Sequence, residues 1–201
     1  MSLRDLFEKY ACPANAGTSF GTDKGPTGHQ YDGVYENLFC NLKNSVTTVL
    51  EIGVDGGGSL MAWSEYFPGA TIWGIDINLA RWTFGRTNPR IRCVEANAVA
   101  LPLPPEIPEM LDIVIDDGSH EERDQLLALQ LWGPRVRHYM VIEDVNLTKN
   151  LALDAAFKWT ASKLGLQYEL VDMRAPGGKE DDVLAIFTPL SKQNTHTINN
   201  D

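Results

Sequence analysis

The stretch VTTVLEIGVDGGGSLMAWSEYFPGATIWGIDI, residues 46–77, decides the predicted fold. Short β-branched runs predict strands over 46–52 and 70–77, with a helix over about 59–67 between them. The glycines allow a tight turn after the first strand, and Ser59 is predicted to cap the helix that follows. A strand, a glycine-rich turn, a helix and a second strand in this order indicate a parallel α/β sheet.

The same alternation continues along the chain. Strands are predicted over 91–96, 111–117 and 139–145, with helices over about 79–86 and 120–132. A helix over 149–164, ended by Gly165, precedes two strands over 167–173 and 183–189 that a short loop makes antiparallel. The expected fold is therefore α/β and Rossmann-like: a mostly parallel seven-stranded sheet with an antiparallel C-terminal hairpin strand and helices on both faces. This is the class I methyltransferase layout.

The segment before the sheet is predicted to be helical and loop-like. A short helix over 1–10 and a loop over 11–29 precede an amphipathic helix whose apolar positions run from Tyr31 to Leu42. The expected division is an N-terminal cap over 1–45, an α/β domain over 46–190 and a flexible polar tail over 191–201.

Composition limits the class of protein. The 201 residues suit one domain, and a net charge of −10 argues against a general nucleic-acid binder, which needs a basic face. Three scattered cysteines favour a reducing compartment. Because no apolar stretch approaches the length of a membrane span and no signal-peptide core is present, we expect a cytoplasmic protein without membrane contact.

The glycine-rich turn and the next strand end predict a nucleoside site. The spacing of Gly53 and the glycines at 56–58 matches neither GxGxxG nor GxxxxGK[ST], and Asp55 would repel a phosphate. Asp76 ends the second strand, where a carboxylate can accept hydrogen bonds from ribose hydroxyls. The alternative is an ordinary tight turn and an exposed strand end.

Three further residues are candidate cofactor contacts. Glu51 lies in the first strand, Asp116 ends the fourth, and Asn97 follows the third, where an adenine would lie. A simple loop role for Asn97 stays open.

An acidic cluster is predicted where two other strands end. IDDGSH (115–120) and IEDV (142–145) would bring Asp116, Asp117, Glu143 and Asp144 to one sheet edge. Unpaired carboxylates this close repel one another, and Mg²⁺, which prefers oxygen ligands, would relieve that cost. The alternative is a set of solvated strand ends.

His120 is the candidate general base. Ser119 and Glu122 match a capping box, which would put His120 in the first helical turn beside the acids. A neutral imidazole there could accept a proton from a hydroxyl. The alternative is a surface histidine.

Four segments together carry a resemblance to a known family: GTDKGPTGHQYDGVYENLF (21–39), VLEIGVDGGGSLMAWSEYFPGATIWGIDIN (49–78), DIVIDDGSHEERDQ (112–125) and VIEDV (141–145). The chain resembles the metal-dependent macrolide-sugar O-methyltransferases of the mycinamicin and tylosin type over roughly residues 15–145. It is also similar to the cephalosporin-hydroxylase-like family.

The resemblance implies specific roles. S-adenosylmethionine would be held by Gly53 and Asp76, and Mg²⁺ by Asp117, Glu143 and Asp144, with His120 as the base. The stretch with Thr22, Asp23 and Lys24 would lie by the cofactor.

The expected reaction is methyl transfer to a hydroxyl of a sugar or glycosylated natural product, on a small-molecule substrate that carries a diol. Related enzymes often assemble, so the resemblance implies a homo-oligomer. Three alternatives stay open: catechol-type O-methylation, with Trp63, Trp73, Trp82 and Trp132 as candidate pocket aromatics; a hydroxylase-like enzyme on the same fold; and a non-catalytic cofactor-binding module.

Overall fold

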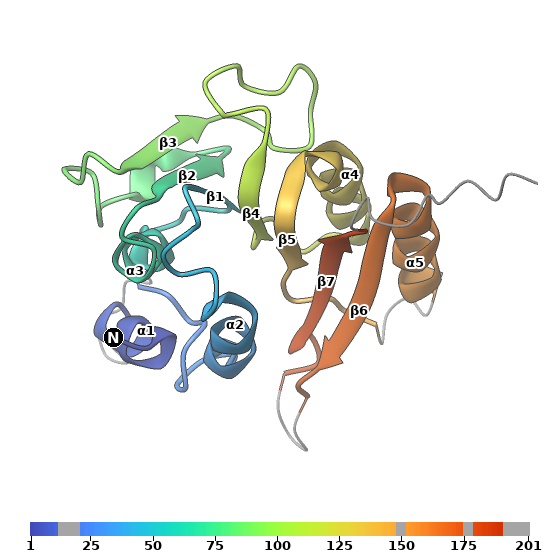
Figure 1. Cartoon of the computed structure of the whole chain (residues 1–201), viewed down its shortest axis with the longest axis horizontal. Coiled ribbons are helices and arrows are strands. Elements are labelled where there is room, and N and C mark those ends of the chain that lie inside the picture. The colour runs from blue at the N-terminus through green and yellow to red at the C-terminus, as the bar shows by residue number, and fades with distance from the viewer. Residues whose placement is uncertain (12–20, 148–151, 175–178, 191–201) are drawn as a thin grey trace, which may run out of the picture.

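The fold is described from a computed structural model, which describes residues 1–11, 21–147, 152–174 and 179–190 (Figure 1). Its sheet has seven strands in the order β3-β2-β1-β4-β5-β7-β6. The strands are β1 (Thr48–Ile52), β2 (Thr71–Asp76), β3 (Ile91–Glu95), β4 (Leu111–Asp116), β5 (Val136–Ile142), β6 (Leu166–Asp172) and β7 (Val183–Pro189). The first five are parallel, and β7 pairs antiparallel with β5 and β6. The predicted fold class is confirmed.

Helices cover both faces of the sheet (Figure 1). One face carries α1 (Leu3–Lys9), α2 (Asp32–Phe39) and α3 (Gly58–Tyr66), and the other carries α4 (Glu122–Trp132) and α5 (Ala152–Leu164). Alternate residues of each strand enter opposite cores: Ile113 packs with α1–α3, and its neighbour Val114 packs with α4 and α5. Among the described residues, no helix is both long and apolar enough to cross a bilayer.

The predicted helix over 79–86 is wrong. Only a short 3-10 turn forms, η1 (Leu79–Arg81), and the backbone of Trp82 is already extended. The amides of Thr83 and Phe84 donate to the carbonyl of Gly56, at 3.1 and 2.9 Å, instead of to a carbonyl one turn earlier. The glycine turn therefore competes for these amides and ends the helix.

The other elements agree with the predicted ones to within a few residues. α5 ends at Leu164, and Gly165 follows with a φ of 70°, the left-handed conformation expected of a helix stop. A second 3-10 turn, η2 (Gly133–Arg135), leads into β5. The first residues of the predicted helix over 149–164 and the predicted tail over 191–201 lie outside the described residues. The division at 45 and 190 stays a prediction.

Candidate active site

The turn after β1 brings the chain against the end of β4. Gly53 has a φ of 89°, and a Cβ built on it would lie 2.0 Å from the carbonyl oxygen of Asp117. Only glycine combines this backbone conformation with so close an approach. The turn therefore holds the ends of β1 and β4 together, as a hydrogen bond from Asp117 N to Ile52 O (2.9 Å) also does, and a hydrogen bond from Gly53 N to Ile75 O (2.9 Å) joins the turn to β2.

Asp76 closes the turn from the end of β2. Its Oδ2 accepts hydrogen bonds from the amides of Val54 (2.8 Å) and Asp55 (3.3 Å), and its Oδ1 accepts one from Asn78 N (3.0 Å). The side chain is half-buried and lines a pocket, so its carboxylate is fixed in direction and can still accept hydrogen bonds from a ligand.

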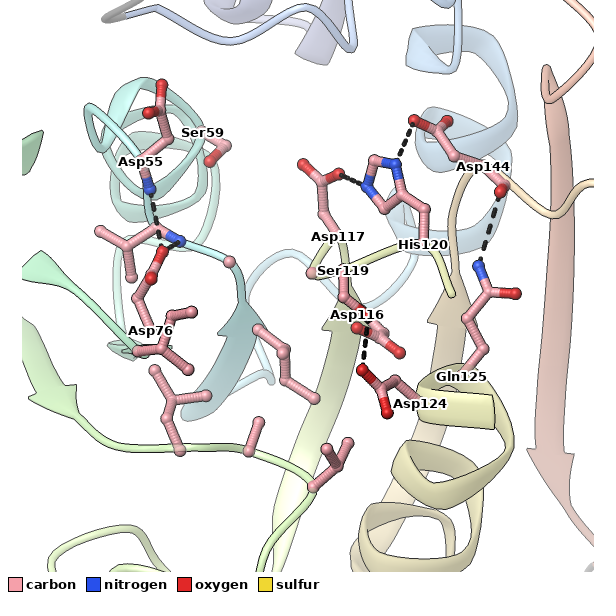
Figure 2. A pocket seen from close by; sticks show the side chains of 18 of the residues that line it. Asp55, Ser59, Asp76, Asp116, Asp117, Ser119, His120, Asp124, Gln125 and Asp144 are labelled. Carbon is pink, nitrogen blue, oxygen red and sulfur yellow. Dashed lines mark hydrogen bonds and ion pairs between the residues drawn. The ribbon is translucent and has the colours of Figure 1, made fainter. Parts of the chain in front are cut away.

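A pocket of about 650 Å³ lies along the strand ends (Figure 2). Predicted site residues line its whole length. These are Thr22, Gly53, Asp76, Asn97, Asp116, Asp117, His120 and Asp144. Its volume is in the range of small-molecule and cofactor sites.

Glu51 and Lys24 do not line this pocket. Glu51 is completely buried, and its Oε2 accepts a hydrogen bond from Ser59 Oγ (2.7 Å). Ser59 therefore does not cap α3 as predicted: the N-cap is Gly57, which makes no side-chain hydrogen bond there. Burial raises the pKa of Glu51 to about 7, although Lys24 opposes the shift.

Asn97 and Asp116 also line the pocket. Asn97 Oδ1 accepts a hydrogen bond from Val99 N (2.9 Å), which supports the loop role left open above. Burial, together with the neighbouring charge of Asp117, raises the pKa of Asp116 to about 7. Asp116 is 6% exposed, so only an edge of it faces the pocket.

Asp117, His120 and Asp144 form the chemically distinctive end of the pocket (Figure 2). His120 Nε2 lies 3.1 Å from Asp117 Oδ1, and His120 Nδ1 lies 3.5 Å from Asp144 Oδ2. One ligand atom from each of the three residues lies within 4.8 Å of the others. The two acidic segments predicted to meet therefore do so, with the imidazole between them.

The predicted capping box before α4 is wrong. The N-cap is Glu121, and Ser119 Oγ instead donates to Asp124 Oδ2 (2.9 Å). His120 precedes the helix with a φ of 56°, which is uncommon for a residue other than glycine. This left-handed turn aims the imidazole back toward Asp117 and Asp144, so the irregular backbone is what places the candidate base.

The hydrogen bond to Asp117 is the main cause that raises the pKa of His120 to about 9. The charges of Asp117 and Asp144 add to this shift, and burial opposes it. Burial favours the neutral form of Asp117, but Lys24 and His120 outweigh that effect and lower the pKa of Asp117. Asp117 and His120 therefore form an ion pair at neutral pH when the carboxylates have no other cation.

Lys24 contacts the acidic cluster from the side that does not line the pocket. Its ammonium donates to Asp117 Oδ2 (2.5 Å) and Glu143 Oε2 (2.9 Å), and lies 3.4 Å from Glu51 Oε1. The other oxygen of Glu143 accepts a hydrogen bond from the hydroxyl of Tyr35. Both oxygens of Glu143 are thus engaged, and its place as a metal ligand stays a prediction.

Asp144 is held by residues that sequence reasoning did not place in the site. The Tyr31 hydroxyl donates to Asp144 Oδ1 (2.6 Å), and His29 Nδ1 lies 3.4 Å from the same oxygen. Gln125 Nε2 donates to the backbone carbonyl of Glu143 (3.0 Å). Tyr31 and Tyr35 both fit the apolar stripe of a helix, so periodicity alone did not reveal that their hydroxyls reach Asp144 and Glu143.

The donor set fits a hard divalent cation. Asp117 and Asp144 supply carboxylate oxygens on one side of the pocket, and His120 is the single nitrogen among them. A second group with this potential consists of His29, Asp181 and Asp182, but its histidine already lies 2.6 Å from both Asp182 Oδ1 and Lys179 Nζ. Each of the two groups found in the described part of the chain holds one histidine, not the two of a facial iron triad.

The candidate aromatic residues do not line the pocket. Trp63 and Trp132 are completely buried, Trp73 is 7% exposed, and none of these or Trp82 is among the lining residues. Of the described residues that line the pocket, His120 alone has an aromatic ring. The tryptophan-lined pocket considered for a catechol is therefore wrong.

Curated relatives of the chain methylate sugars on natural products. The chain is 35% identical to the 8-demethyl-8-(2-methoxy-alpha-L-rhamnosyl)-tetracenomycin-C 3'-O-methyltransferase of Streptomyces olivaceus, over 62% of this chain and 34% of the relative. It is 31% identical to the 8-demethyl-8-alpha-L-rhamnosyl tetracenomycin-C 2'-O-methyltransferase of the same organism, over 76% and 43%. The chain thus spans less than half the length of these relatives.

A solved structure shares the fold. The MycE methyltransferase of the mycinamycin pathway, in complex with Mg and SAH, superimposes with a TM-score of 0.66 and 22% identity, over 94% of this chain and 54% of that one. No protein-family model matches the chain. The chain is therefore a homologue of the sugar O-methyltransferases of macrolide and tetracenomycin pathways, with the Rossmann-like fold of class I methyltransferases.

Proposed function

We propose that the chain is an S-adenosylmethionine-dependent, Mg²⁺-dependent O-methyltransferase that acts on a hydroxyl of a sugar in a glycosylated natural product. The observation that carries the proposal is the continuity of one pocket. Asp76 lines one end, and Asp117, His120 and Asp144 line the other (Figure 2). Gly53 lines the part between them, because it follows β1, which lies between β2 and β4. A nucleoside cofactor and an acceptor hydroxyl would therefore meet in one cavity.

The glycine turn and Asp76 fit the nucleoside half of the cofactor. A side chain at Gly53 would overlap the backbone of Asp117 at the edge of the pocket, so glycine keeps this edge close-packed. Asp76 offers carboxylate oxygens to the ribose hydroxyls. The other proposed cofactor contacts are Thr22, Asn97 and Asp116. Glu51 and Lys24 would support the cofactor site from behind the residues that line the pocket. When bound, S-adenosylmethionine supplies a methyl group that passes to the hydroxyl oxygen as its carbon–sulfur bond breaks.

Asp117 and Asp144 would hold the divalent cation, with Glu143 as the third proposed ligand. The bound cation supplies positive charge that favours loss of the acceptor's proton. The protein keeps Asp117 and Asp144 oriented through Lys24 and Tyr31, which fix one oxygen of each carboxylate. The other oxygens, Asp117 Oδ1 and Asp144 Oδ2, point to His120.

His120 accepts the proton of the acceptor hydroxyl in this proposal. Its pKa of about 9 depends first on the hydrogen bond to Asp117, so the imidazole is protonated while that carboxylate is free. Engagement of Asp117 and Asp144 by a cation removes this support and favours the neutral imidazole, the form that can act as a base. At 38% exposed, the side chain remains accessible to an acceptor.

The acceptor class is proposed from the relatives. Their names specify methylation at the 2' and 3' oxygens of a rhamnosyl group, and a sugar with neighbouring hydroxyls suits the acidic end of the pocket. A small-molecule acceptor, in place of a nucleic acid, also agrees with the net charge of −10. We further propose a cytoplasmic enzyme, because the cysteines suit a reducing compartment, and a homo-oligomer, by resemblance to related enzymes.

Binding and turnover test the proposal separately. Saturating S-adenosylhomocysteine should raise the melting temperature by about 5–10 °C, since ligand at a hundred times its Kd adds about 2.7 kcal/mol, whereas NAD should not. Formation of S-adenosylhomocysteine should then be measured with rhamnosides, with catechols and with no acceptor. Turnover with rhamnosides, lost in EDTA while cofactor binding persists, is expected. A preference for catechols would overturn the proposed acceptor class. Full activity in EDTA would overturn the proposed role of the metal.

Two histidine variants give a matched comparison. His120→Gln should lower turnover about 100-fold or more with little change in cofactor affinity, because it removes the base but not the pocket. His138→Gln, in β5 and away from the pocket, should retain activity. Equal activity of the two variants would remove His120 from the mechanism.

A further inference from the structure

Among the described residues, Lys24 is the most deeply buried lysine or arginine. It is 1% exposed and is among the largest completely buried side chains of the described residues. An isolated ammonium at such a position is very costly, so Lys24 is there because its partners compensate its charge. These partners are Glu51 in β1, Asp117 after β4 and Glu143 after β5. Lys24 thus joins three adjacent strands from a loop that precedes the sheet.

The three acids depend on Lys24 in turn. Glu51 and Glu143 are 0% and 2% exposed, so water cannot compensate their charges. Glu51 Oε1 makes no hydrogen bond and lies 3.4 Å from the ammonium. Without Lys24, these carboxylates would face one another across a buried space, and like charges in that setting repel strongly.

Lys24 also divides the cluster into two halves. It takes Oδ2 of Asp117 and Oε2 of Glu143, while Oδ1 of Asp117 is left beside His120 on the pocket side. The group of ligand atoms that lie close together accordingly contains Asp117 and Asp144 but not Glu143. One side of the cluster is therefore neutralised from within, and the other is open to a cation.

We propose that Lys24 is a positioning residue that acts as a built-in cation: it holds Asp117 and Glu143 in place without a divalent ion and keeps one oxygen of Asp117 directed into the pocket. This inference deepens the proposed function and rests on it for the metal, but its test reads stability and not methyl transfer. A negative result in the methyl-transfer assay therefore leaves the stability test of Lys24 valid, and a negative stability test leaves the methyl-transfer assay valid.

The test compares melting temperatures of the full chain in EDTA and in Mg²⁺. Lys24→Met should melt about 10 °C below the wild type in EDTA, because breaking a buried ion pair costs several kcal/mol in a protein of this size. Mg²⁺ should recover at least about half of that loss by entering the vacated space, and should stabilise the wild type less. The control is Lys9→Met, which removes an exposed ion pair with Glu65 and should shift melting by about 2 °C or less in both conditions.

A double variant decides the sign of the interaction. Glu51→Gln alone should lower the melting temperature, because it removes a partner of Lys24, whereas in the Lys24→Met background it should raise it by removing a repelling charge. This reversal and the recovery by Mg²⁺ are both expected. The proposal is overturned if Lys24→Met loses equal stability in EDTA and in Mg²⁺, or if Glu51→Gln destabilises it further. If Lys24→Met is unfolded in EDTA, its failure to fold in Mg²⁺ also overturns the proposal.

Discussion

Gly53 lies at the edge of the active site, and two glycines elsewhere in the fold allow the causes of its sensitivity to substitution to be separated. Gly53 combines a φ of 89° with close approach to another segment, since its Cβ would lie 2.0 Å from Asp117 O. Gly165 has a φ of 70° with nothing within 4 Å, and Gly33 lies in α2 with neither constraint. Replacement by alanine should therefore add backbone strain and steric overlap at Gly53, backbone strain alone at Gly165, and neither at Gly33.

The expected magnitudes follow from these surroundings. A left-handed conformation costs a residue with a Cβ about 1 kcal/mol, and overpacking adds about 2 kcal/mol more. Gly53→Ala should thus lose about 3 kcal/mol, or 6–12 °C in melting temperature, and Gly165→Ala about 1 kcal/mol. Gly33→Ala should gain up to about 1 kcal/mol, because alanine is the better helix former.

Urea denaturation followed by circular dichroism measures all three variants at one pH. Gly53→Ala should also bind S-adenosylhomocysteine more weakly, because the ends of β1 and β4 must move apart to make room for the alanine side chain. The reasoning is refuted if Gly53→Ala is no less stable than Gly165→Ala. Such a result would mean that the contact with Asp117 yields at negligible cost.

Two further predictions concern buried acids. Tyr35→Phe should cost about 1–3 kcal/mol in urea denaturation, because it leaves one oxygen of Glu143 without its hydrogen-bond donor, and an unchanged midpoint would contradict this role. Burial alone would raise the pKa of Asp112, but hydrogen bonds from Thr47, Thr48 and Arg137 outweigh it and lower the pKa. Its stabilising contribution should therefore be complete above the unfolded-state pKa of about 3.9 and be lost as the pH falls below it. Asp112→Asn should weaken the acid dependence of stability between about pH 5 and 2, and an unaltered profile would count against this role.

The local pattern of the chain was sufficient to predict the sheet and the main parts of the site. Strand-length β-branched runs alternating with helix-length segments predict a parallel sheet, and in such a sheet the strand ends meet at one edge. Asp76 ends a strand, and Asp117 and Asp144 follow strands, so their convergence on one pocket could be expected from position alone. The glycine turn after β1 could be expected for the same reason.

Tertiary contacts decided how the side chains around the acids are used. The helix expected over 79–86 is lost to hydrogen bonds with Gly56, which is remote in sequence. His120 reaches the acids through a left-handed turn and not from a helix, and no local pattern predicts that conformation. In both cases a distant partner outweighs a weak local preference.

Sequence by itself therefore determined the order of strands and helices and the edge at which the acids gather, because hydrophobic periodicity and chain connectivity are local properties. Only the tertiary structure revealed that Lys24 lies buried among Glu51, Asp117 and Glu143, and that Tyr31 and Tyr35 donate to the acids. The pairing of buried charges depends on which distant segments are brought within about 3 Å, and that distance is set by packing of the whole fold.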